Sequence, residues 1–83
     1  MPLTLYHFRG CPYCEIVLNY MAQNQISISL KDIQEDPTHR EELKRIGGET
    51  QVPCLVIDGK ALYESVDIIK WLRKNWSRVS KPD

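Results

Sequence analysis

The sequence lacks several features that mark specialised classes of protein. It has only three cysteines in 83 residues, and its basic and acidic residues balance to a formal net charge of zero. A disulfide-rich secreted scaffold would carry more cysteines, in even number. Balanced charge gives no electrostatic reason to expect a nucleic acid or an anionic membrane as partner. No apolar run is long enough to span a bilayer, and the first residues lack the pattern of a secretory signal. We therefore expect a cytoplasmic protein with neither partner.

What remains is the composition of an ordinary globular domain. Hydrophobic residues make up 42% of the chain and charged residues 27%. The length suits one domain with a single small core. There is no internal repeat, linker or low-complexity segment. We assign residues 1–76 to one domain and residues 77–83 to a polar tail, and we expect a monomer.

The hydrophobic pattern predicts seven elements of secondary structure. Alternating or short apolar runs indicate strands, and apolar residues at helical spacing indicate helices. Asp36 and the following proline are typical of a helix start, and two glycines at 47 and 48 of a helix end. The Asp58-Gly59 pair is a strong hairpin signal. The predicted strands are 3–8, 26–33, 53–57 and 60–63, and the predicted helices are 12–24, 37–47 and 65–76.

The order of these elements indicates the fold. It reads β-α-β-α-β-β-α, so the first two strands must be parallel, joined by a right-handed crossover. The hairpin strands must be antiparallel. We therefore predict an α/β fold, a four-stranded mixed sheet flanked by helices, in the order of the thioredoxin fold.

The segment GCPYC, residues 10–14, places two cysteines where the first strand gives way to a helix. Such a pair can bind a metal, form a structural disulfide or cycle between thiol and disulfide. A structural zinc site needs about four ligands, and Cys54, His7 and His39 form no second close pair. A disulfide across two residues closes a very small loop and stabilises little. Redox cycling is the favoured interpretation of the three.

Cys11 and Cys14 are suited to divide this chemistry between them. Cys11 falls at a helix N-terminus, where unpaired N–H groups and the helix dipole favour the nucleophilic thiolate. Cys14 lies one turn further along and deeper, close enough to attack a mixed disulfide on Cys11. We predict that Cys11 attacks and that Cys14 resolves.

At this point the sequence resembles glutaredoxin. CPYC after a strand, then TQVP at residues 50–53, then the Asp58-Gly59 hairpin, matches that family over nearly the whole chain. The resemblance implies glutathione as reductant, no metal, and a cis bond before Pro53 beside the cysteines. It also implies that the N–H and C=O of Val52 pair with the cysteinyl backbone of glutathione or with an extended peptide.

One stretch departs from the usual glutaredoxin pattern, which has glycine and aspartates at the start of the last helix. Here the stretch is LYESVDI, residues 62–68, with Ile69 after it. It is similar to the N-terminal domain of glutathione transferases, in which a Glu-Ser pair holds the γ-glutamyl end of glutathione. The similarity implies this role for Glu64 and Ser65, and a helix N-terminus suits a carboxylate. Asp67 is an alternative contact for the glutathione amine, and Ser65 as a simple N-cap is the alternative interpretation.

Other side chains are weaker candidates. We expect Tyr13 to lie exposed beside Cys11 and to stack over the ligand. Arg9 is a candidate for the thiolate or the glycine carboxylate of glutathione, and Arg40 and Lys44 are further candidates for that carboxylate. The full set of predicted glutathione contacts is Arg9, Tyr13, Gln51, Val52, Pro53, Glu64 and Ser65. We expect a buried, unreactive Cys54, no chemistry at His7, and core-edge packing of Trp71 and Trp76.

These inferences lead to one expected activity and its rivals. We expect a glutathione-dependent thiol–disulfide oxidoreductase, with disulfide-containing or glutathionylated proteins as partners. One rival is a glutaredoxin-like donor reduced by thioredoxin reductase. Another is a module that binds glutathione or an iron–sulfur cluster. A transferase needs a second, helical domain, for which we expect no room in 83 residues.

Overall fold

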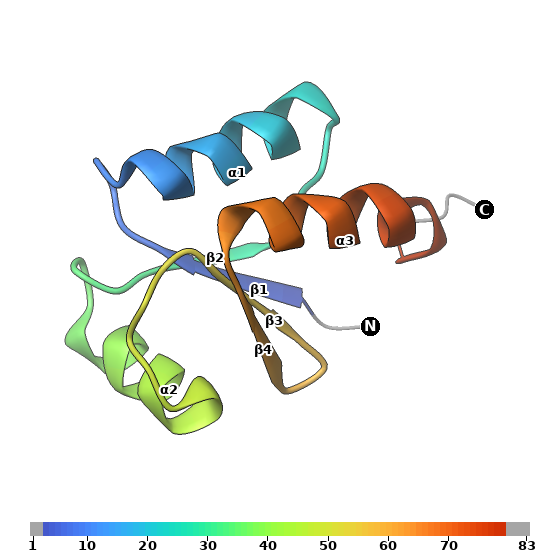
Figure 1. Ribbon diagram of the computed structural model, residues 1–83. Helices are drawn as coiled ribbons and strands as arrows, with labels where there is room; N and C mark the ends of the chain where they lie inside the picture. Colours follow the sequence, from blue (N-terminus) through green and yellow to red (C-terminus); the bar gives the residue numbers. More distant parts are fainter. Residues whose placement is uncertain (1–2, 80–83) are drawn as a thin grey trace.

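Four strands form one mixed sheet, and three helices cover its two faces (Figure 1). The structure is a computed structural model and describes residues 3–79. The element order β-α-β-α-β-β-α confirms the predicted fold class. The elements are β1 (Leu3–His7), α1 (Pro12–Gln23), β2 (Ser29–Asp32), α2 (Pro37–Gly47), β3 (Cys54–Ile57), β4 (Lys60–Tyr63) and α3 (Ser65–Val79).

The sheet topology decides which loops meet. The strand order is β2-β1-β3-β4, with β1 parallel to β2 and antiparallel to β3, and β3 antiparallel to β4. Tyr6, near the end of β1, is paired with Cys54, the first residue of β3. The segment that leaves β1 therefore lies beside the segment that enters β3. This places the cysteine motif next to the Val52-Pro53 pair.

The core has two parts, one on each face of the sheet. On the face covered by α1 and α3, the fully buried side chains include Leu5, Val17 and Leu72. On the face covered by α2, Leu43 and Cys54 are fully buried. Side chains alternate between the faces along each strand, so neighbouring residues serve different parts of the core. Trp71 and Trp76 pack half-buried against the first part, as predicted.

The predicted strand 26–33 is wrong in where it starts and in which of its side chains are buried. β2 is only four residues long, and Leu30 is half exposed instead of sharing a buried face with Ile26. Ile26 belongs to the end of α1: its N–H donates to the carbonyl of Met21 at 2.8 Å, and Gln25 before it is left-handed at φ 56°. These features form a Schellman motif, which buries the residue just past a helix. The cap explains why Ile26 is buried outside the strand.

The last helix extends beyond the predicted boundary at Trp76. α3 runs to Val79, so residues 77–79 of the predicted tail are helical, and residues 80–83 lie outside the described part of the chain. Both predicted caps of α2 are confirmed. Asp36 accepts a hydrogen bond from the N–H of Thr38 at 3.0 Å, and Gly48 ends the helix at φ 86°. Among the helices of residues 3–79, none combines the length and apolar character needed to cross a membrane.

Candidate functional site

The cysteine motif forms the junction between β1 and α1. Gly10 takes φ 92°, which turns the chain so that Cys11 becomes the N-cap of the helix, and Pro12 starts the first turn. Proline suits this position because its missing N–H would have no helical partner. The N–H of Cys14 donates to Sγ of Cys11 at 3.4 Å. The sulfur of Cys11 therefore already caps a helix N–H, a geometry that favours a sulfur anion there.

The two thiols differ in access. Cys11 keeps 7% of its surface exposed, whereas Cys14 has none. Burial raises the pKa of the Cys14 thiol to about 12, helped by its hydrogen bond to Cys11 and by the like charge of that group, against a hydrogen bond from Phe8. Cys14 is therefore a neutral thiol at physiological pH. Only Cys11 combines a helix N-cap position with access from solvent, as the predicted division of roles requires.

A cleft lies beside this pair. Its volume is about 360 Å³, and three segments contribute to it: the first turn of α1, the chain before β3, and the start of α3. Figure 1 shows these three segments converging on one end of the molecule. The Val52-Pro53 bond is cis, as predicted. The residues that line the cleft are Tyr13, Gln51, Val52, Pro53, Glu64, Ser65 and Val66.

The structure thus brings together six of the seven predicted glutathione contacts. Tyr13 is 64% exposed, in agreement with its predicted position at the surface. Arg9 is the exception: it is exposed in the turn before Cys11 and does not line the cleft. Its contact with a ligand stays a prediction. Val66 lines the cleft with an exposed apolar side chain, and the sequence pattern gave no signal for it.

The alternative interpretation of Ser65 as the N-cap of the last helix is wrong by one residue. The carbonyl of Glu64 accepts the N–H of Ile68 at 3.0 Å, so Glu64 is the cap and Ser65 is the first helical residue. Glu64 is left-handed at φ 77°, which is uncommon for a residue other than glycine. Its carboxylate Oε2 accepts a hydrogen bond from Nε2 of Gln51 at 3.2 Å. This bond links the two sides of the cleft, and local sequence patterns do not reveal it.

Cys54 is the third free thiol, and it does not line the cleft. It is fully buried in the part of the core covered by α2. Burial raises the pKa of its thiol from 9.0 to about 11, against hydrogen bonds from Leu62 and Tyr63. The predicted burial of Cys54 is confirmed, and its lack of reactivity stays a prediction.

The Cys54 pKa predicts a loss of stability in alkali. Between about pH 9 and pH 11 the unfolded chain has released this proton and the folded chain keeps it, so rising pH favours unfolding. From about pH 8 to pH 10.5 this one group should remove about 2 kcal/mol from the free energy of unfolding. Denaturant titrations measure the free energy of unfolding of the wild type and of Cys54→Ala at both pH values. The stability gap between the two proteins should shrink by that amount, and an unchanged gap would contradict the assignment.

Neither histidine lines the cleft. His7 is buried in β1, and its Nδ1 has no hydrogen-bond partner among the described residues. Nδ1 of His39 lies 3.1 Å from the carbonyl oxygen of Asp32, so it ties α2 to the end of β2. Within residues 3–79, no three side chains of His, Cys, Asp or Glu gather where a metal ion could be held.

Comparison with known proteins identifies the family. The family of glutathione S-transferase N-terminal domains matches residues 5–79. The chain belongs to this family. A Clostridium pasteurianum protein, described as an uncharacterized glutaredoxin-like 8.6 kDa protein in the rubredoxin operon, is 24% identical over 74 residues, which are 87% of this chain and 99% of that protein. These matches confirm the resemblance to the transferase N-terminal domain and the resemblance to glutaredoxin, both of which were inferred from the sequence.

Solved structures of this transferase-like domain family and of glutaredoxins share the fold. Glutathione transferase Omega 3C from Trametes versicolor matches with a TM-score of 0.78 and 23% identity, over 92% of this chain and 34% of its own. Glutaredoxin C1 from Populus tremula x tremuloides matches with a TM-score of 0.68 and 21% identity, over 89% of this chain and 76% of its own. At these identities the likeness establishes the fold alone.

Proposed function

We propose that this protein is a glutathione-dependent thiol–disulfide oxidoreductase that reduces protein disulfides and mixed disulfides of glutathione. The observation that carries the proposal is the pair of unequal thiols at the start of α1. Cys11 is the accessible N-cap residue and Cys14 is a buried neutral thiol one turn away. A nucleophile and a resolving thiol need this difference.

The chemistry follows from the two positions. The thiolate of Cys11 attacks one sulfur of a substrate disulfide, the S–S bond breaks, and the other substrate sulfur leaves as a thiolate. Cys14 then gives up its proton and attacks Sγ of Cys11, which releases the second substrate thiol. The protein is left with a Cys11–Cys14 disulfide, and two electrons have passed to the substrate. Two molecules of glutathione restore the dithiol and leave as glutathione disulfide.

The cleft supplies chemistry that suits glutathione. Val66 and Asp67 follow Ser65 in the first turn of α3, where backbone N–H groups have no helical acceptor and favour a carboxylate. The exposed carboxylate of Glu64, held by Gln51, suits an ammonium group. A carboxylate and an ammonium on one carbon are what the γ-glutamyl end of glutathione presents. Within residues 3–79 the backbone of Val52 makes no hydrogen bond, so it can pair with a cysteinyl backbone.

A coupled assay tests the reductant. NADPH consumption is followed with a glutathione mixed disulfide as substrate, once with glutathione and glutathione reductase and once with thioredoxin reductase alone. We expect turnover only in the first arrangement. Turnover only in the second would overturn the glutathione dependence and would move the protein to donors that thioredoxin reductase reduces.

Replacing Ser65 with alanine tests the glutathione cleft. We expect Ser65→Ala to raise the KM for glutathione by about 10-fold, because a hydrogen bond to a charged group is lost. The first step, attack by pre-reduced Cys11 on a non-glutathione disulfide, should keep its rate. Ser27→Ala is the matched control, since Ser27 is exposed and outside the cleft. Equal KM values for the two variants would count against the assigned cleft.

A further inference from the structure

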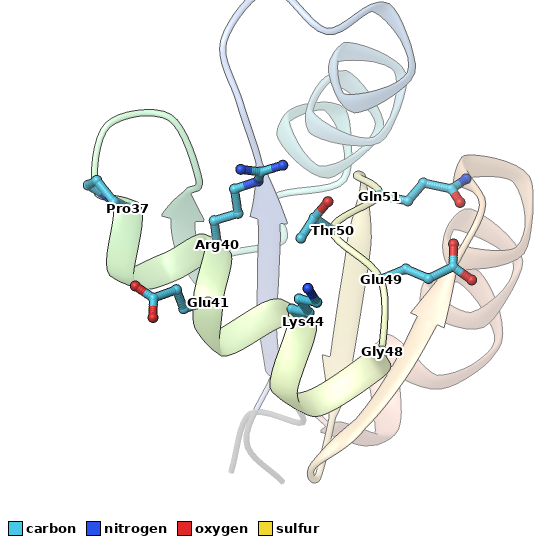
Figure 2. Close-up of a pocket in the computed structure, with 8 residues that line it drawn as sticks. All are labelled: Pro37, Arg40, Glu41, Lys44, Gly48, Glu49, Thr50 and Gln51. Carbon is cyan, nitrogen blue, oxygen red and sulfur yellow. The ribbon is translucent and has the colours of Figure 1, made fainter.

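A second hollow adjoins the cleft. It lies between α2 and the segment 48–51, and its volume is about 750 Å³. Figure 2 draws the residues of this α2 groove. Gln51 lines both the groove and the cleft, so the two hollows adjoin at this residue. The residues that line the groove are Pro37, Arg40, Glu41, Lys44, Gly48, Glu49, Thr50 and Gln51.

Two cations in the lining of the groove, Arg40 and Lys44, have no ion-pair partner among the described residues. Arg40 and Lys44 lie one turn apart on α2 and extend toward Thr50 across the groove (Figure 2). Neither makes an ion pair or a side-chain hydrogen bond with any of the described residues. The two acidic residues of the groove, Glu41 and Glu49, point away from it in the same view. Like charges four residues apart disfavour a helix slightly, so α2 itself gains nothing from this pair.

The opposite wall of the groove is backbone that has no partner. Within residues 3–79, Thr50, Gln51 and Val52 make no backbone hydrogen bond. The preceding residue, Glu49, is anchored to β4, because the hydroxyl of Tyr63 donates to the carbonyl oxygen of Glu49 at 3.0 Å. An anchored stretch of backbone with unpaired N–H and C=O groups can pair with the backbone of a peptide strand.

We propose that the α2 groove binds an extended acidic segment of the protein whose disulfide Cys11 attacks. The backbone of the segment would pair along Thr50–Val52, and its carboxylates would meet Arg40 and Lys44. The groove adjoins the cleft at Gln51, and the cleft is lined by Tyr13, the residue just before Cys14. A chain lying in the groove would therefore extend toward the cysteine motif. The proposal rests on the thiol–disulfide chemistry proposed for Cys11 and Cys14. It does not depend on glutathione being the reductant.

The test uses a single turnover, so that no reductant system is needed. Protein reduced beforehand and freed of reductant is mixed with a peptide that carries one internal disulfide next to a run of glutamates. A second peptide has glutamines in their place. The proteins are the wild type, the double variant Arg40→Gln/Lys44→Gln, and the control Arg73→Gln/Lys74→Gln. The control removes the same charge from exposed positions on α3, outside the groove.

The wild type should reduce the glutamate peptide about 2- to 25-fold faster than the glutamine peptide, since each of the two exposed ion pairs is worth up to about fivefold. The groove variant should lose this preference and keep its rate on the glutamine peptide, whereas the control should retain the preference. Added salt should shrink it. Equal wild-type rates on the two peptides, or the same loss in both variants, would overturn the proposal. Failure of the glutathione assay alone would leave the peptide preference intact and overturn only the reductant.

Discussion

Replacing Cys11 with serine should reduce the turnover of every disulfide substrate by at least about 1,000-fold. Cys11 is the N-cap of α1 and keeps some exposure, whereas Cys14 is fully buried as a neutral thiol. No other thiol of the described chain reaches the surface, because Cys54 is also fully buried. A serine hydroxyl is a weak nucleophile at neutral pH and forms no disulfide. Single-turnover reduction of a peptide disulfide and the coupled glutathione assay should both report the loss.

The control for this variant is Cys54→Ala. It also removes one thiol, but from the part of the core covered by α2 and not from the lining of the cleft. It should keep the activity of the wild type within about twofold once its lower stability is allowed for. Residual activity of Cys11→Ser on any disulfide would show that another thiol can attack, and the assignment of the nucleophile would fail.

The sequence predicted the elements whose signals are local. The DG hairpin, the caps of α2 and the CPYC turn each depend on a few adjacent residues, and all are found where expected. The predicted strand 26–33 starts too early because Ile26 continues an alternating apolar pattern, whereas β2 begins at Ser29. The burial of Ile26 comes instead from the helix end, where Gln25 takes a conformation that glycine usually supplies. A cap made by glutamine leaves no compositional signal.

Most residues of the cleft could be predicted only from the resemblance to glutaredoxin and to the transferase N-terminal domain. Tyr13 and Val52 meet because β1 and β3 pair, and Ser65 joins them because β4 pairs with β3. Only a known topology brings such distant segments together. The bond between Gln51 and Glu64 is a side-chain contact between two loops, which no spacing rule indicates. The same holds for the α2 groove, whose opposite walls come from one helix and from the segment that follows it. The sequence does not indicate that Arg40 and Lys44 lie opposite the segment 48–51, and this position is the basis for their proposed role.

Replacing Cys14 with serine should separate two activities that Cys11 supports together. Reduction of protein disulfides should fall by at least about 100-fold, because the mixed disulfide on Cys11 then has no internal thiol to release it. Removal of glutathione from mixed disulfides should stay within about threefold of the wild type. There the glutathione on Cys11 is released by a second glutathione. Parallel assays on a peptide disulfide and on a glutathionylated peptide measure the two activities.

The pKa of Cys14 explains why this division can work. Burial is the main cause of its elevation to about 12, and the hydrogen bond and like charge of Cys11 add to it. Once Cys11 is in a mixed disulfide, it no longer carries charge, and the contribution of that charge disappears. The loss of this contribution lowers the pKa of Cys14, while burial, the larger cause, continues to raise it. Full activity of Cys14→Ser on the peptide disulfide would mean that external thiols resolve every intermediate, and the buried thiol would then have no catalytic part.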